Sequence, residues 1–192
     1  MRNLRNLAAL TVFTAIAVQA AVVPRPAPDL AINLAPGKQV RLSQYRGKTV
    51  VLAFILTYCS HCQAVVRGLI KDQQELGPKG LQVVATAIED TAATAIPGFL
   101  RLFTPPFPAG YNTNPEALQF LQHSPMLAFY MPGLAIIDKT GVIRAQFEGR
   151  DLPEGTQEKL IHDKILEVMN LSAPEPATHK PASGKKTAAK RN

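Results

Sequence analysis

Apolar runs alternate with stretches of helical periodicity along most of this chain. Thr49–Leu56 and Leu81–Ile88 are continuous apolar runs with the length of strands that are buried on both faces of a sheet. Between these runs, apolar residues recur at helical spacing until Gly77-Pro78, at Val65, Val66, Leu69, Ile70 and Leu76. A strand, a helix and a strand in this order predict a βαβ crossover with parallel pairing.

Two hairpins and three further helices complete the predicted elements. The expected hairpins are Leu30–Leu34 with Gln39–Leu42, and Gly133–Asp138 with Val142–Phe147. The expected helices cover part of 91–103, where Pro97 and Gly98 interrupt the pattern, a stretch near Pro115–Gln122, and about Pro153–Asn170. We therefore predict an α/β fold with a central mixed β-sheet flanked by helices and an N-terminal β-hairpin extension.

The two ends of the chain have a different composition from residues 29–171, which we expect to form the single folded domain. Residues 1–20 have the pattern of a signal peptide, in which Arg2 and Arg5 precede the apolar run Leu7–Val18 and small residues precede a cleavage point after Ala20. An uncleaved N-terminal anchor is the alternative. Residues 21–28 are predicted to form a Pro-rich linker, and residues 172–192 a disordered basic tail.

Positive charge is concentrated at these ends. The net charge of the chain is +7, but residues 21–171 contain 14 Lys and Arg against 13 Asp and Glu. A folded domain that is close to neutral does not present the basic face that nucleic-acid binding requires. We therefore expect no nucleic-acid partner.

The chain has only two cysteines, Cys59 and Cys62, and they are three positions apart. A structural disulfide stabilises a fold mainly by closing a long loop, and this pair would close almost none. Zinc sites of this spacing usually combine two such pairs, and the chain has no second pair. We therefore expect redox chemistry at these cysteines, with no metal and no cofactor.

The Tyr58-Cys59-Ser60-His61-Cys62 motif follows a predicted strand and opens a predicted helix. Unpaired N–H groups and the helix dipole favour a thiolate on Cys59, the form that attacks a disulfide. Cys62 lies about one turn later, where it can attack the mixed disulfide. The flanking Tyr58 and the central residues Ser60 and His61 are expected to tune the redox potential, since a positive charge on His61 would favour the reduced form.

The sequence resembles the thioredoxin superfamily, and within it the exported TlpA-like/redoxin (AhpC/TSA-type) thiol–disulfide oxidoreductases. The resemblance covers roughly residues 28–170 and rests on Pro28-Asp29-Leu30, on residues 42–48, on the cysteine motif and on residues 131–141. It implies that Pro132 is a cis proline facing the cysteines, and that the Met131 backbone is free to pair with an extended substrate. It also implies protein thiols or disulfides as substrates and a membrane or periplasmic redox partner, with no specific small-molecule ligand.

Three positions depart from the family pattern. The family usually has Trp before the first cysteine, where this chain has Tyr58. The two positions at which relatives carry a carboxylate that relays protons to the resolving thiol are occupied by Ala53 and Val65. No replacement for this carboxylate is predicted, because Glu89-Asp90 has the pattern of a solvated loop. The remaining histidines, His123, His162 and His179, are expected to play no part.

Two other functions fit parts of the sequence. A peroxiredoxin-like thiol peroxidase is one alternative, although the proline and threonine that position peroxide in that group correspond here to Leu52 and Leu56. A copper-handling protein is the other, although exported copper chaperones of this fold have three residues between their cysteines. The direction of electron flow stays open.

Overall fold

The computed structural model describes residues 22–171. The predicted signal peptide (1–20), the first residue of the predicted linker and the predicted tail (172–192) lie outside the described residues. The strands are β1 (Arg25–Pro26), β2 (Ala31–Ala35), β3 (Lys38–Arg41), β4 (Thr49–Ile55), β5 (Leu81–Ala87), β6 (Ala109–Tyr111), β7 (Gly133–Ile137) and β8 (Val142–Phe147). The helices are α1 (Ser60–Leu76), α2 (Ala92–Phe103), α3 (Asn114–Leu121) and α4 (Gln157–Leu171), with short 3-10 helices at η1 (Leu42–Tyr45), η2 (Gly77–Lys79) and η3 (Gly149–Asp151).

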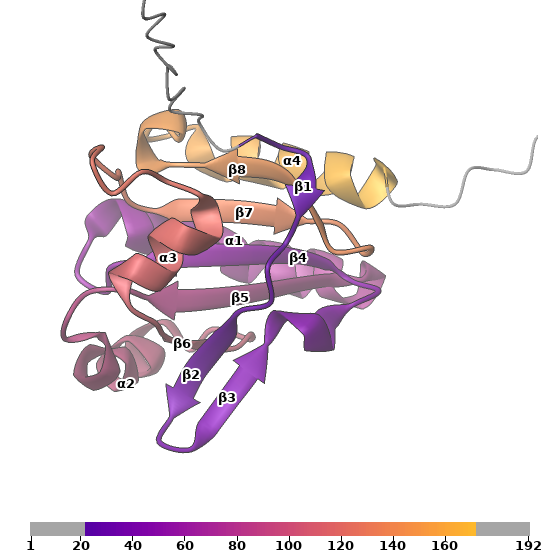
Figure 1. The fold of residues 1–192 in the computed structure, drawn as a ribbon. Coiled ribbons are helices and arrows are strands. Elements are labelled where there is room, and N and C mark those ends of the chain that lie inside the picture. Colours follow the sequence, from indigo (N-terminus) through magenta and orange to yellow (C-terminus); the bar gives the residue numbers. More distant parts are fainter. Residues whose placement is uncertain (1–21, 172–192) are drawn as a thin grey trace, which may run out of the picture.

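The strands of the described residues form one mixed sheet in the order β1-β8-β7-β4-β5-β6-β2-β3 (Figure 1). Every residue of β4 is buried, as its continuous apolar sequence predicts. β4 pairs in parallel with β5 and antiparallel with β7. Because β4 and β5 are parallel, their carboxyl ends meet at one edge of the sheet, with Ile55 opposite Ala87. The cysteine motif follows β4 at this edge.

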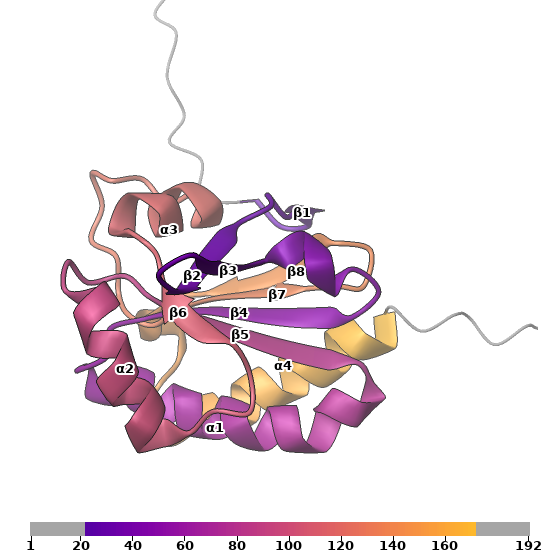
Figure 2. The same cartoon turned by 90° about the horizontal axis from the view of Figure 1, so that it is seen from below.

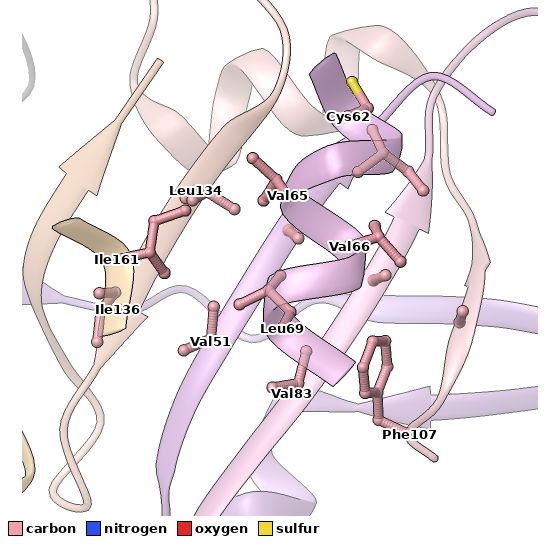
Figure 3. Packing of buried hydrophobic residues seen from close by; sticks show 14 of the residues in the cluster. Val51, Cys62, Val65, Val66, Leu69, Val83, Phe107, Leu134, Ile136 and Ile161 are labelled. Carbon is pink, nitrogen blue, oxygen red and sulfur yellow. The ribbon is translucent and has the colours of Figure 1, made fainter. Parts of the chain in front are cut away.

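Helices cover both faces of the sheet (Figure 2). α1, α2 and α4 lie on one face, where Val65 and Leu69 of α1 pack with Ile161 of α4 against Val51 and Val83 (Figure 3). α3 covers the other face, and its Phe120 ring lies 5.7 Å from that of Phe54. The predicted mixed sheet flanked by helices is confirmed, and so is the N-terminal hairpin, formed by β2 and β3.

A polar contact links α1 to α4. The Nδ1 atom of His162 lies 2.7 Å from Oδ1 of Asp72, whose side chain is only 6% exposed. The hydrogen bond with Asp72 raises the pKa of His162, and burial raises the pKa of Asp72. His162 lies on the surface of α4, as expected, and its side chain links this helix to a buried carboxyl on α1.

Three local features differ from the sequence-based expectations. α2 runs through the exposed Pro97 without a break, and the buried Ile96 and Phe99 hold the helix on the sheet on either side of it. β6 was not predicted, because it is short and follows a Pro-rich stretch, and it pairs with β5 and β2. Within the predicted linker 21–28, β1 pairs with β8 through Arg25 and Pro26.

Candidate active site

Cys59 lies at the junction between β4 and α1. It is the N-cap residue of α1, and its sulfur accepts a hydrogen bond from the backbone N–H of Cys62 at 3.4 Å. Its own N–H donates to the Leu56 carbonyl at 3.1 Å, which closes the turn between strand and helix. The side chain is partly exposed. The sulfur therefore occupies the place where a helix stabilises negative charge.

Cys62 lies one turn into α1 and is fully buried. It sits at the end of the apolar cluster around Val65 (Figure 3). Its sulfur accepts a hydrogen bond from the backbone N–H of Leu56 at 3.5 Å. Burial raises the pKa of the Cys62 thiol. Both cysteines are free thiols in the structure, so the arrangement is that of the reduced pair.

The other residues of the motif differ in exposure. Tyr58 is 72% exposed and Ser60 is also exposed. His61 is half-buried, and its Nε2 atom is buried with no hydrogen-bond partner within residues 22–171. The imidazole is thus not a freely solvated ring.

Met131 and Pro132 enter the same region from the segment before β7. The Met131–Pro132 peptide bond is cis, as the family resemblance implies, and Pro132 is buried. Met131 lines a groove of about 440 Å³ together with Tyr58 and with the apolar side chains of Leu56, Leu118, Leu127 and Phe129. We call this the Met131 groove. Within residues 22–171 no hydrogen bond engages the Met131 N–H, so this group can pair with an added chain, whereas the Met131 carbonyl oxygen lies against Gly149.

Glu89 is a site residue that the sequence reasoning missed. It is half-buried rather than part of a solvated loop, and its Oε1 accepts hydrogen bonds from the Thr57 N–H at 3.1 Å and from the Thr57 hydroxyl. Its Oε2 is buried and has no partner in the described part of the chain. The carboxylate positions of other family members are apolar here, since Ala53 and Val65 are both buried. Glu89 therefore brings a carboxylate to the cysteine turn from a different strand.

His123 follows α3, as expected, and its side chain is buried. Its side chain is only 8% exposed, and its Nε2 lies 3.1 Å from Oε1 of Glu148. Among residues 22–171, no three His, Cys, Asp or Glu side chains are grouped in a way that could hold a metal ion.

The amino-acid sequence matches a known protein family. Residues 23–146 match the AhpC/TSA family. The thiol-disulfide oxidoreductase ResA of Bacillus thuringiensis is 23% identical over 138 residues, which cover 72% of this chain and 76% of that protein. ResA of Bacillus subtilis is 25% identical over 148 residues, covering 77% and 74%.

A solved structure agrees with these relatives. The putative thiol:disulfide interchange protein DsbE of Chlorobium tepidum superposes with a TM-score of 0.64 at 22% identity, covering 76% of this chain and 96% of that one. This likeness confirms the thioredoxin fold. Together with the curated relatives and the matched family, it shows that the chain belongs to the AhpC/TSA family and is a thiol–disulfide oxidoreductase of the thioredoxin fold.

Proposed function

We propose that this enzyme exchanges disulfides with protein substrates through Cys59 and Cys62, with Cys59 as the attacking thiol and Cys62 as the resolving thiol. The observation that supports this assignment is the contrast between the two sulfurs. Cys59 is partly exposed at the start of α1 and receives the Cys62 N–H at 3.4 Å, whereas Cys62 is fully buried. Only the first sulfur is accessible to a large substrate.

In the reducing direction, the Cys59 thiolate attacks one sulfur of the substrate disulfide. The substrate S–S bond breaks, one substrate sulfur leaves as a thiolate that takes up a proton, and a mixed disulfide forms. Cys62 then loses its proton and attacks the Cys59 sulfur. The mixed disulfide breaks, the second substrate thiol is released, and two electrons have passed from the cysteine pair to the substrate. A redox partner must reduce the pair again, and the reverse sequence would oxidise a substrate dithiol.

The surroundings of the pair favour an extended polypeptide as substrate. The Met131 groove is lined by apolar side chains together with the polar Glu89, Asp90 and Asn114, and the unpaired N–H of Met131 can donate to a chain laid along it. In this arrangement Met131 and Pro132 bind the substrate, while Tyr58, Ser60 and His61 tune the redox potential of the pair.

Trapping of mixed disulfides tests the assignment of the two cysteines. Cys62→Ser should accumulate covalent complexes with substrate proteins, because nothing resolves them, and these complexes should disappear on reduction. Cys59→Ser should give none, because Cys62 cannot reach a substrate. The double variant is the matched control for adventitious complexes. Equal trapping by both single variants would contradict the assignment.

We also propose that the protein is exported and works in the periplasm. The support is the sequence pattern of residues 1–20, which lie outside the described residues. None of the helices between residues 22 and 171 combines the length and hydropathy of a membrane span. Cell fractionation with N-terminal sequencing of the mature protein tests the proposal. A mature chain that begins at Ala21 is the expected result, and a cytoplasmic protein that retains Met1 would contradict it.

A further inference from the structure

The segment that carries Met131 has no regular structure of its own. We call residues 123–131 the groove segment, because it contributes Pro125, Leu127, Phe129 and Met131 to the Met131 groove. It connects α3 to β7 without a helix or strand, and its internal hydrogen bonds are confined to the turn at Ser124. Because so few internal hydrogen bonds hold the segment in one conformation, its position depends on contacts with the rest of the domain.

One carboxylate supplies a contact at the start of this segment. Glu148 follows β8 directly, and its Oε1 lies 3.1 Å from Nε2 of His123. Its Oε2 accepts two hydrogen bonds from Arg150, at 2.7 Å from Nη2 and 3.1 Å from Nε. The side chains of His123 and Glu148 are only 8% and 16% exposed. The contact is therefore shielded from water, which strengthens it relative to a surface ion pair.

The next two residues contact the other end of the segment. The Gly149 N–H donates to the Tyr130 carbonyl at 2.7 Å, and the Arg150 guanidinium lies 4.7 Å from the centre of the Tyr130 ring. Gly149 also lies against Met131 so closely that a Cβ atom there would be 2.1 Å from the Met131 carbonyl oxygen. Residues 148–150 thus contact the groove segment at both ends.

We propose that Glu148, with His123 and Arg150, forms a positioning network that holds the Met131 backbone in the place where an extended substrate pairs with it. This inference rests on the proposed function. If the Met131 backbone is already ordered before the substrate arrives, less conformational entropy is lost on binding. We call this backbone the pairing edge. Exchange with a polypeptide depends on that edge, whereas exchange with a small aromatic disulfide such as Ellman's reagent needs only the Cys59 sulfur.

The test compares Glu148→Gln and Arg150→Gln with the wild-type enzyme. Arg150 is 53% exposed, so its replacement leaves the core intact. Single-turnover exchange is measured in the direction that the redox potential of the cysteine pair favours. This means either reduced enzyme with a disulfide-bridged peptide, or oxidised enzyme with the reduced peptide. The half-saturating peptide concentration should rise about fivefold to tenfold in both variants, since each loses contacts that order the segment. The limiting rate of peptide exchange and the rate with Ellman's reagent should stay within about twofold of the wild-type values. The redox potential of the cysteine pair should be unchanged.

Two further variants sharpen the interpretation. Arg150→Lys keeps the positive charge beside Glu148 and Tyr130 and should recover part of the loss. Arg144→Gln is the matched control, because it breaks another arginine–carboxylate contact, the 2.6 Å bond to Asp138, near the opposite end of the β7–β8 hairpin. Its half-saturating concentration should equal that of the wild type.

Each unfavourable outcome has its own meaning. Unchanged half-saturation in both Gln variants, with the wild-type exchange intact, overturns the positioning role and leaves the proposed function standing. An equal loss of the rate with Ellman's reagent also overturns it, since the network would then be merely structural. A wild-type enzyme that reacts with Ellman's reagent but exchanges with no polypeptide overturns the proposed function, and this inference with it.

Discussion

Glu89, two residues beyond the end of β5, accepts hydrogen bonds from both polar groups that Thr57 offers it, its backbone N–H and its hydroxyl. The remaining polar group of Thr57, its carbonyl, accepts a bond from Nε2 of Gln63 at 2.9 Å. Thr57 lies two residues before Cys59, so these bonds fix the turn that presents the reactive sulfur. The contact joins the ends of the two parallel strands β4 and β5.

Replacement of Glu89 tests how much the turn depends on this contact. Glu89→Ala leaves the Thr57 N–H and hydroxyl without their partner, and we expect a loss of about 1–3 kcal/mol in the free energy of unfolding. Glu89→Gln keeps one carbonyl oxygen as an acceptor and should recover most of this loss. Urea unfolding of the reduced protein measures both values.

Asp90→Ala is the matched control for Glu89. Asp90 is exposed beside Glu89, and its replacement should change the free energy of unfolding by less than about 0.5 kcal/mol. If Glu89→Ala proves no more harmful than Asp90→Ala, the contact with Thr57 contributes nothing to stability.

Alkylation should separate the two cysteines. Cys59 is partly exposed, whereas Cys62 is fully buried and burial raises the pKa of its thiol. Because only an accessible thiolate reacts with iodoacetamide, the folded reduced protein should be modified at Cys59 at least about tenfold faster than at Cys62. Peptide mapping by mass spectrometry follows both sites, and labelling in urea is the control in which both should react. Equal rates in the folded protein would argue against the assigned roles.

The central sheet could be predicted from the sequence because its strands carry strong local signals. β4 and β5 are continuous apolar runs, and β7 and β8 flank a turn at Lys139-Thr140-Gly141. The shorter strands could not be found in this way. β6 has three residues after a Pro-rich stretch, and β1 has two and contains Pro26. Both exist through pairing with distant strands, which a local pattern does not encode.

The same distinction applies to the site. Cys59 and Cys62 are adjacent in sequence to the strand and helix that position them, so their placement at a helix start could be predicted. Glu89 meets Thr57 only because Ile55 pairs with Ala87, which sets the residues two positions beyond them side by side. His123 and Glu148 are 25 positions apart, and the irregular segment 123–131 followed by the β7–β8 hairpin brings them together. These contacts depend on strand register and loop path, and neither could be inferred without the fold.

His61 gives a prediction about the redox potential. A positive charge near the Cys59 thiolate stabilises the reduced pair, so its removal should make the couple more reducing. We expect His61→Pro to lower the potential by tens of millivolts, on the order of 30 mV or more. The proline is compatible with the fold, because His61 lies in the first turn of α1.

His61→Gln is the matched variant for this measurement, since it removes the ionisable imidazole and keeps a polar side chain of similar size. It should move the potential in the same direction as His61→Pro. Equilibration with glutathione or thioredoxin standards measures all three couples. A potential that stays at the wild-type value in both variants would contradict a tuning role for His61.

Asp138 predicts a loss of stability in acid. Its carboxylate begins the β7–β8 turn and accepts hydrogen bonds from Thr140, from the Val142 N–H and from Arg144. Burial alone would raise its pKa, but these bonds outweigh burial and lower the pKa of Asp138 from 3.8 to about 2. In the unfolded chain the carboxyl has its ordinary pKa. Its contribution, about 2 kcal/mol, is therefore complete above about pH 4 and is lost as the pH falls towards 2.

Asp138→Asn should expose this contribution directly. At pH 6 the variant should be less stable than the wild type by about 2 kcal/mol, and the difference should shrink as the pH falls from 4 towards 2, because the wild-type carboxyl then takes up a proton. Urea unfolding across this range measures both proteins. Asp163→Asn is the control, because the Asp163 side chain is 57% exposed and forms a surface ion pair with Lys159 on the same helix face. A difference for Asp138→Asn that stays constant down to pH 2.5 would show that the ionised carboxylate is not what holds this turn.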